Sequence, residues 1–159
     1  MIINKIKSYF VMLNASKLQG RGDYKNVIEL SLNALELNPK SLLAFTMLAD
    51  DYPRLGKYDE AEELLAKALK IYPKDCQLNY HMGVVMIKNE EPIQKALPFL
   101  ENYLKFKPNK NGKFPWYMNL FSTLSQKKID WQKFGKELNE YEDSKTQWVK
   151  KIIEENKKS

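Results

Sequence analysis

A block of sequence returns along this chain at a fixed distance. The stretch that opens with Gly22-Asp23-Tyr24 and closes with Asn38-Pro39 comes back as a stretch from Gly56-Lys57-Tyr58 to Tyr72-Pro73, shifted by 34 residues. A third copy closes at Pro108, 35 residues after Pro73. Self-similarity at such a period is typical of chains that stack one small unit on the next, so that neighbouring units bury a shared core. The period therefore predicts a repeat architecture.

A period near 34 residues, with small residues at fixed places and a closing proline, resembles the tetratricopeptide repeat (TPR), a unit of two helices. The resemblance implies an all-α fold: a right-handed α-solenoid of three TPR helix hairpins, a degenerate fourth hairpin and a long C-terminal capping helix. We expect a single domain over residues 1–159. Its parts would be repeats at 8–41, 42–75 and 76–110, then the terminal hairpin and capping helix at 111–159.

The resemblance also implies three small residues in each repeat, because paired helices approach closely only where no large side chain stands between them. The nine positions hold Ala15, Val27 and Ala34, then Ala49, Ala61 and Ala68, then Gly83, Ala96 and Tyr103. Tyr103 departs from the pattern, and it predicts a different distance or angle for the next helix.

The turns inside the first two hairpins carry glycines, which we expect to end a helix in the left-handed conformation. These are Gly22 and Gly56. Asp23 and Asp59 are predicted to cap the helices that follow, because a short carboxylate can accept the free backbone N–H groups of a first turn.

The last thirty residues read as one long amphipathic helix. Its apolar residues form a stripe with helical spacing, namely Trp131, Phe134, Leu138, Tyr141, Trp148 and Ile152. Two interpretations stay open. The helix covers the exposed end of the repeat stack, or the stripe is an oligomer or partner seam.

Charge and composition exclude several classes of protein. The net charge is +6 and is carried by lysine, since arginine occurs only at Arg21 and Arg54. Nucleic-acid readers usually use arginine forks, so a nucleic-acid partner is not expected. No run approaches the roughly 20 apolar residues of a membrane span, and the N-terminal segment does not fit a signal peptide. One cysteine, Cys76, fits a reducing compartment, and the chain is predicted to be cytoplasmic.

The residues give little support to catalysis. Cys76 and His81 are the only cysteine and histidine, so a zinc site with about four such ligands is not expected. No glycine-rich phosphate loop occurs, and no group is placed to orient His81 as a base. We predict no catalytic residue, no metal, no cofactor and no enzymatic activity.

The resemblance implies a concave face lined by the first helix of each repeat. The partner-binding positions that it implies are Tyr9, Met12, Ser16, Leu43, Thr46, Met47, Asp50, Arg54, Gln77, Tyr80, His81, Val84 and Lys88. Heat-shock chaperone adaptors of the family clamp a peptide carboxylate with lysine, asparagine and arginine at such positions. Here the matching positions hold Met12, Ser16, Met47, Gln77 and His81, so that clamp is absent. Methionines and aromatics suit an apolar or amphipathic peptide instead.

These observations predict a non-enzymatic protein–protein interaction module, an adaptor or assembly chaperone, with a protein or peptide ligand in its concave groove. The alternative is a self-assembling structural subunit, a homo-oligomer joined through the C-terminal helix or the groove. In a further alternative, the chain's own ends cover the groove.

Overall fold

The computed structural model describes residues 2–107 and 131–157, which form seven helices and no strand. The helices are α1 (Ile2–Gln19), α2 (Tyr24–Leu37), α3 (Leu42–Arg54), α4 (Tyr58–Ile71), α5 (Cys76–Lys88), α6 (Ile93–Phe106) and α8 (Trp131–Asn156). They belong to two compact units, Met1–Phe106 and Lys107–Ser159. The first half of the predicted fourth hairpin, in residues 111–130, lies outside the described residues. Within the described ranges no helix is both long and apolar enough for a bilayer crossing.

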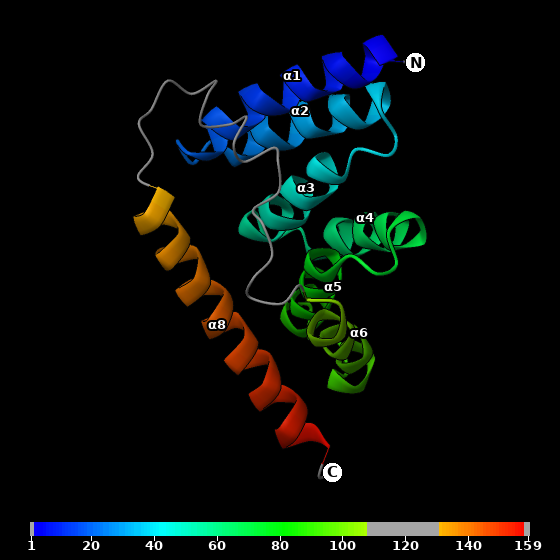
Figure 1. Cartoon of the computed structure of the whole chain (residues 1–159). Helices are drawn as coiled ribbons and strands as arrows, with labels where there is room; N and C mark the ends of the chain where they lie inside the picture. Colours follow the sequence, from blue (N-terminus) through cyan, green and yellow to red (C-terminus); the bar gives the residue numbers. More distant parts are fainter. Residues whose placement is uncertain (1, 108–130, 158–159) are drawn as a thin grey trace. The chain divides into compact units, whose positions relative to one another are not determined.

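The first unit is a stack of three helical hairpins, α1/α2, α3/α4 and α5/α6 (Figure 1). Each helix packs on the next one in the chain, and α3 also packs on α5, the first helix of the following hairpin. The helices α3 and α5 begin at Leu42 and Cys76, which open the second and third predicted repeats, whereas α1 begins six residues before Ser8. The all-α solenoid is confirmed in this unit.

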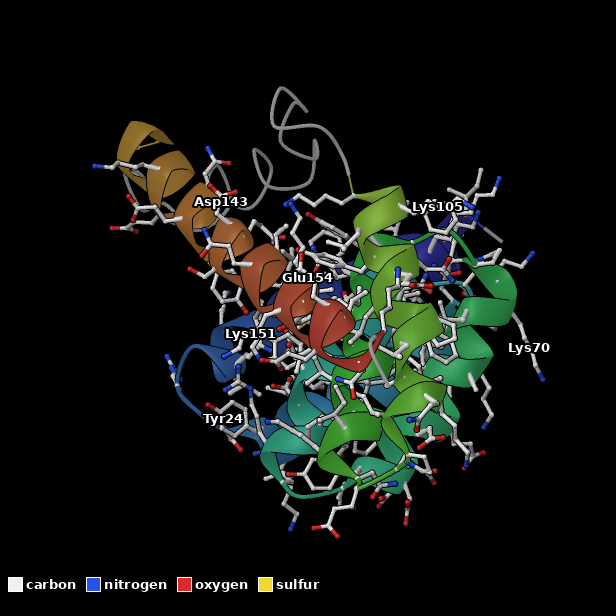
Figure 2. The ribbon with its side chains drawn as sticks, turned by 90° about the horizontal axis from the view of Figure 1, so that it is seen from below. Tyr24, Lys70, Lys105, Asp143, Lys151 and Glu154 are labelled. Atoms are coloured by element: carbon white, nitrogen blue, oxygen red, sulfur yellow. The ribbon has the colours of Figure 1, made fainter. Side chains whose placement is uncertain are left out.

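The positions where small residues were expected lie in the core of the first unit. Ala15, Val27 and Ala34 are fully buried, as are Ala61 and Ala68 of the second hairpin. At Gly83 of α5 an added Cβ would lie 2.4 Å from Cδ2 of Leu100 on α6, so an alanine there would force the Leu100 side chain to shift. Tyr103 is buried completely in spite of its size. Lysine side chains project from the helix surfaces, as Lys70 does from α4 (Figure 2).

The turns within the hairpins follow the 34-residue period closely. Gly22 and Gly56 have φ of 77° and 71°, which confirms the left-handed conformation expected there. The same conformation returns 34 residues later at Glu90, with φ 57°, although this residue carries a side chain. The inserted residue of the third repeat follows this point.

Capping confirms one expectation and corrects another. The carboxylate of Asp23 accepts the backbone N–H of Asn26, so Asp23 caps α2 as predicted. Asp59 does not cap α4, because the helix begins at Tyr58 and Asp59 lies inside its first turn. There its negative charge interacts favourably with the positive end of the helix dipole. Sequence reasoning missed the caps Ser41 and Asp75, whose side chains accept the N–H groups of the third residue on.

Candidate functional site

The candidate binding surface is formed by residues of α1, α3 and α5, the first helices of the three hairpins. The packing of α3 on α5 brings Asp50 and His81 together, with 3.7 Å between Oδ1 of the carboxylate and Nε2 of the imidazole. The side chain of His81 is only 15% exposed, whereas that of Asp50 is 47% exposed. A protonated His81 would form an ion pair with Asp50, and the exposed carboxylate offers an acceptor to a donor from outside.

Aromatic rings extend this surface along α5. The ring of Tyr80 lies edge-on to His81, with the centroids 5.7 Å apart. Tyr80 also contacts the buried ring of Tyr103 on α6, at 5.2 Å between centroids. Such tilted pairs are favourable contacts between aromatic rings. A half-buried tyrosine thus packs against a second, fully buried tyrosine.

Two predicted binding residues are core residues. Met12 is fully buried and Met47 is 6% exposed, and both belong to a core cluster with Ala15, Val27 and Ala44. A methionine is long and flexible enough to fill the space between α1 and α3. The expectation that Met12 and Met47 face a ligand is corrected accordingly.

The other predicted binding residues keep some exposure. Asp50, Arg54 and Lys88 are exposed, and the half-buried ones are Tyr9, Ser16, Leu43, Thr46, Gln77, Tyr80, His81 and Val84. Several already have internal contacts. The Thr46 hydroxyl donates to the carbonyl of Leu43 at 3.0 Å, and the Arg54 guanidinium lies 5.1 Å from the centre of the Tyr24 ring.

Tyr9 differs from the rest because its hydroxyl is buried. The oxygen has no hydrogen-bond partner among the residues that the structure describes. Burial raises the pKa of this phenol above its usual value. A buried hydroxyl without a partner costs free energy, so Tyr9 is a polar group of this surface that the described residues leave unsatisfied.

Sequence reasoning missed Asp51, the residue next to Asp50. It is fully buried, and its two carboxylate oxygens accept hydrogen bonds from Nε2 of Gln19 at 3.1 and 3.0 Å. Arg54 Nε lies 3.6 Å from Oδ1. Burial raises the pKa of the Asp51 carboxyl, while the Gln19 hydrogen bond lowers it in part. Asp51 joins the end of α1 to α3, and the only sequence signal was a carboxylate in the register position where the next repeat has Val85.

The predicted seam on α8 is described only in part. Side chains of Trp131, Phe134 and Leu138 lie outside the described residues, whereas Tyr141 and Trp148 are 59% and 37% exposed and Ile152 is half-buried. Among the α8 side chains that the structure describes, the buried ones are Lys145, Val149 and Ile153. The ammonium of Lys145 pairs with Glu142 at 2.9 Å. The seam remains a prediction.

The described residues contain no group of three or more His, Cys, Asp or Glu side chains that could hold a metal ion. The polar groups of the candidate surface are a carboxylate, an imidazole, phenols and amides. In this arrangement they can hydrogen-bond and orient a peptide.

No protein-family model matches the chain, and no curated protein does. Among solved structures, it is similar to "First TPR of Spaghetti (RPAP3) bound to HSP90 peptide SRMEEVD", at 20% identity and a TM-score of 0.62, over 77% of this chain and 95% of that one. It is also similar to MamA 41-end from Desulfovibrio magneticus RS-1, at 15% identity and a TM-score of 0.58, over 94% and 77%. The MamA RS-1 ArsTM double mutant gives the same TM-score over 91% and 75%. The chain has the fold of tetratricopeptide-repeat proteins.

Proposed function

We propose that the chain is a non-enzymatic protein-interaction module, an adaptor or assembly chaperone, that binds an apolar or amphipathic peptide segment. The observation that carries this proposal is the group of Asp50, Tyr80 and His81, where a carboxylate, a phenol ring and an imidazole from two adjacent first helices come together. Half-buried Leu43 and Val84 supply apolar surface on the same two helices. Apolar area with a few placed polar groups is typical of peptide sites.

The fold supports the same proposal. The RPAP3 domain of the same fold is described as bound to an HSP90 peptide. The positions of the chaperone clamp hold other residues here, so the proposed ligand is not a peptide gripped by its terminal carboxylate. The partner-facing residues are then Tyr9, Ser16, Leu43, Thr46, Asp50, Arg54, Gln77, Tyr80, His81, Val84 and Lys88.

A displayed library of random peptides, selected against the full chain, tests the proposal. The affinity of selected peptides is then measured by fluorescence anisotropy for the parent, Tyr80→Ala and Asp50→Lys. We expect each variant to bind at least about fivefold more weakly, a loss of about 1 kcal/mol, because both residues would touch the peptide. Asp50→Lys is the safer variant, since Tyr80 also packs on buried Tyr103.

Glu63→Lys on α4 is the matched control, because Glu63 is exposed and the charge change is the same. It should bind as the parent does, and all variants should keep their helical circular dichroism. Selected peptides that bind the parent, Tyr80→Ala and Asp50→Lys equally would contradict the groove. A selection that yields no peptide at all would contradict it too.

The second candidate function is self-assembly through α8, which the exposed rings of Tyr141 and Trp148 favour. Exposed aromatic side chains on one helix are frequent at protein interfaces. Under this alternative the intact chain sediments as a dimer or larger, and Trp148→Asp gives a monomer. A monomer at every concentration excludes a stable assembly.

A further inference from the structure

The first turns of α1 carry the main concentration of exposed apolar side chains in the described residues. Ile2, Ile3, Ile6 and Phe10 are 73%, 66%, 51% and 59% exposed. The five other exposed large hydrophobic residues are scattered over the rest of the described chain. A contiguous exposed apolar patch usually marks a surface that binds something.

The helix geometry places this patch on the side of α1 that faces away from the core. Ser8, Met12 and Ala15 form the buried side, and the Ser8 hydroxyl donates to the carbonyl of Ala34 on α2 at 2.8 Å. Ile6 and Phe10 each lie two residues from Ser8, which is a rotation of about 200° on a helix. The two sides of α1 are therefore both apolar, and only one of them has a partner within the hairpin.

Positive charge borders the exposed side. Residues 1–22 contain Lys5, Lys7, Lys17 and Arg21 and no aspartate or glutamate. Lys5 and Lys7 are exposed and lie one residue before and one after Ile6, about 100° to either side of it. An apolar stripe with lysines along both borders is typical of helices that lie in the plane of a bilayer, because the lysine stems stay in the apolar layer while the ammonium groups reach the headgroups.

We propose that this side of α1 (Ile2, Ile3, Ile6 and Phe10, bordered by Lys5 and Lys7) docks the protein on an anionic lipid surface. Charge complementarity selects this occupant over a second copy, because a symmetric contact through the same face would bring lysines against lysines. A single convex helix side also needs no shaped partner when it enters a deformable acyl layer. The helix would lie in the membrane interface without crossing the bilayer, and it would bring the proposed peptide-binding module to a membrane surface.

Vesicle co-sedimentation with the full chain tests the proposal. The parent is mixed at low salt with vesicles of phosphatidylcholine alone and with vesicles that also contain phosphatidylglycerol. We expect binding to the anionic vesicles that weakens at high salt, because surface charges are then screened. Ile6→Ser/Phe10→Ser and Lys5→Glu/Lys7→Glu should each lower the vesicle partition coefficient at least tenfold.

Two control variants make the same chemical changes elsewhere. Leu55→Ser/Ile71→Ser removes two exposed hydrophobic residues, and Lys67→Glu/Lys70→Glu reverses two exposed lysines of α4. Both should retain binding. The proposal is overturned if the parent ignores anionic vesicles or if the control lysine pair weakens binding as much as Lys5 and Lys7. It is also overturned if Ile6→Ser/Phe10→Ser dissolves a dimer in sedimentation while vesicle binding stays unchanged.

Discussion

The second and third hairpins have nearly the same helix bounds but fill their cores differently. Ala68 of α4 and Tyr103 of α6 hold the same repeat position, and both are fully buried. The ring of Tyr80 on α5 contacts Tyr103, and the position equivalent to Tyr80 in α3 is Thr46. A pair of small residues in one hairpin is thus a pair of tyrosines in the next. The third hairpin therefore holds more side-chain volume at these positions than the second does, and because protein interiors are close-packed its helices must leave room for both rings.

This difference bears on function, because Tyr80 is part of the candidate binding surface. In the second hairpin the same position holds Thr46, whose hydroxyl donates to the carbonyl of Leu43. In the third hairpin it holds an aromatic ring that rests on a buried ring. The departure from the repeat pattern at Tyr103 therefore places a buried ring against half-buried Tyr80 of the candidate binding surface.

Truncating Tyr103, which holds the repeat position of Ala68, should have the largest effect. Tyr103→Ala leaves a cavity under Tyr80 and should lower the free energy of unfolding by about 3 kcal/mol, measured by urea denaturation. Ile71→Ala, at a residue 37% exposed, is the control and should cost less than about 1 kcal/mol. Equal small losses would show that the third hairpin does not depend on the volume of Tyr103.

The reciprocal change places a larger side chain at the small-residue positions of the second hairpin. Ala68→Leu or Ala61→Leu should destabilise by about 1–3 kcal/mol, because both alanines are fully buried between helices. Leucine at exposed Lys57 or Lys67 should change stability by less than about 0.5 kcal/mol. Thermal and urea unfolding of the four variants would measure this, and equal tolerance at all four sites would contradict the packing described here.

Among the described glycines, Gly83 at the crossing of α5 and α6 has the least room for an added methyl group. Gly83→Ala places a methyl group against buried Leu100 and should cost about 1–2 kcal/mol, even though alanine favours a helix. Ala49→Gly at the equivalent place in α3 should cost about 1 kcal/mol for the opposite reason, loss of helix propensity. A double-mutant cycle of Gly83→Ala with Leu100→Val isolates the clash, and a coupling near zero would argue against it.

The sequence predicted the backbone better than the side chains. The 34-residue period implies where α3 and α5 begin, and Gly22 and Gly56 have the left-handed conformation expected of them. Of the thirteen residues predicted on the binding surface, only Met12 and Met47 are buried. Their position in the repeat is compatible with either the groove or the core. The choice depends on how α1 and α3 pack, which one sequence cannot specify.

Asp51 and Glu90 were missed for a related reason. A carboxylate normally lies at the surface, so nothing in the sequence placed Asp51 in the core, where Gln19 donates to both of its oxygens. Glu90 follows the period of Gly22 and Gly56, but the residue type hid the left-handed turn.

The turn at Glu90 gives a prediction of smaller size and opposite sign. A left-handed residue with a side chain is strained, so Glu90→Gly should stabilise the protein by about 0.5–1 kcal/mol in urea denaturation. Gly56→Ala should destabilise the second hairpin by about 1 kcal/mol, because alanine is strained in the left-handed conformation. Nothing lies within 4 Å of the added methyl group, so no steric clash adds to this cost. Stability changes of opposite sign for Glu90→Gly and Gly56→Ala would confirm that the two turns have the same backbone conformation.

The smallest effect concerns the buried carboxylate that distinguishes α3 from α5, where Val85 takes the place of Asp51. Burial raises the pKa of Asp51, so the folded protein keeps this proton to a higher pH than the unfolded chain does. Stability should fall as the pH rises from the unfolded pKa, about 3.9, through the raised folded pKa, and then level off. Asp51→Asn keeps an acceptor for Gln19 without the charge, and it should lack this fall. The effect is small because Gln19 and Arg54 offset part of the burial cost.

Urea midpoints of the parent and Asp51→Asn, measured from pH 3.5 to pH 6.5, should therefore separate in favour of the variant as the pH rises. Asp50→Asn is the control, because that carboxylate is 47% exposed and its charge raises the pKa of Asp51 less than burial does, so this change should reduce the fall without abolishing it. If the parent instead gains on the variant with rising pH, Gln19 and Arg54 outweigh the burial of the charge. Asp51 would then be a stabilising link between the first two hairpins, and the valine of the third hairpin would be the weaker solution.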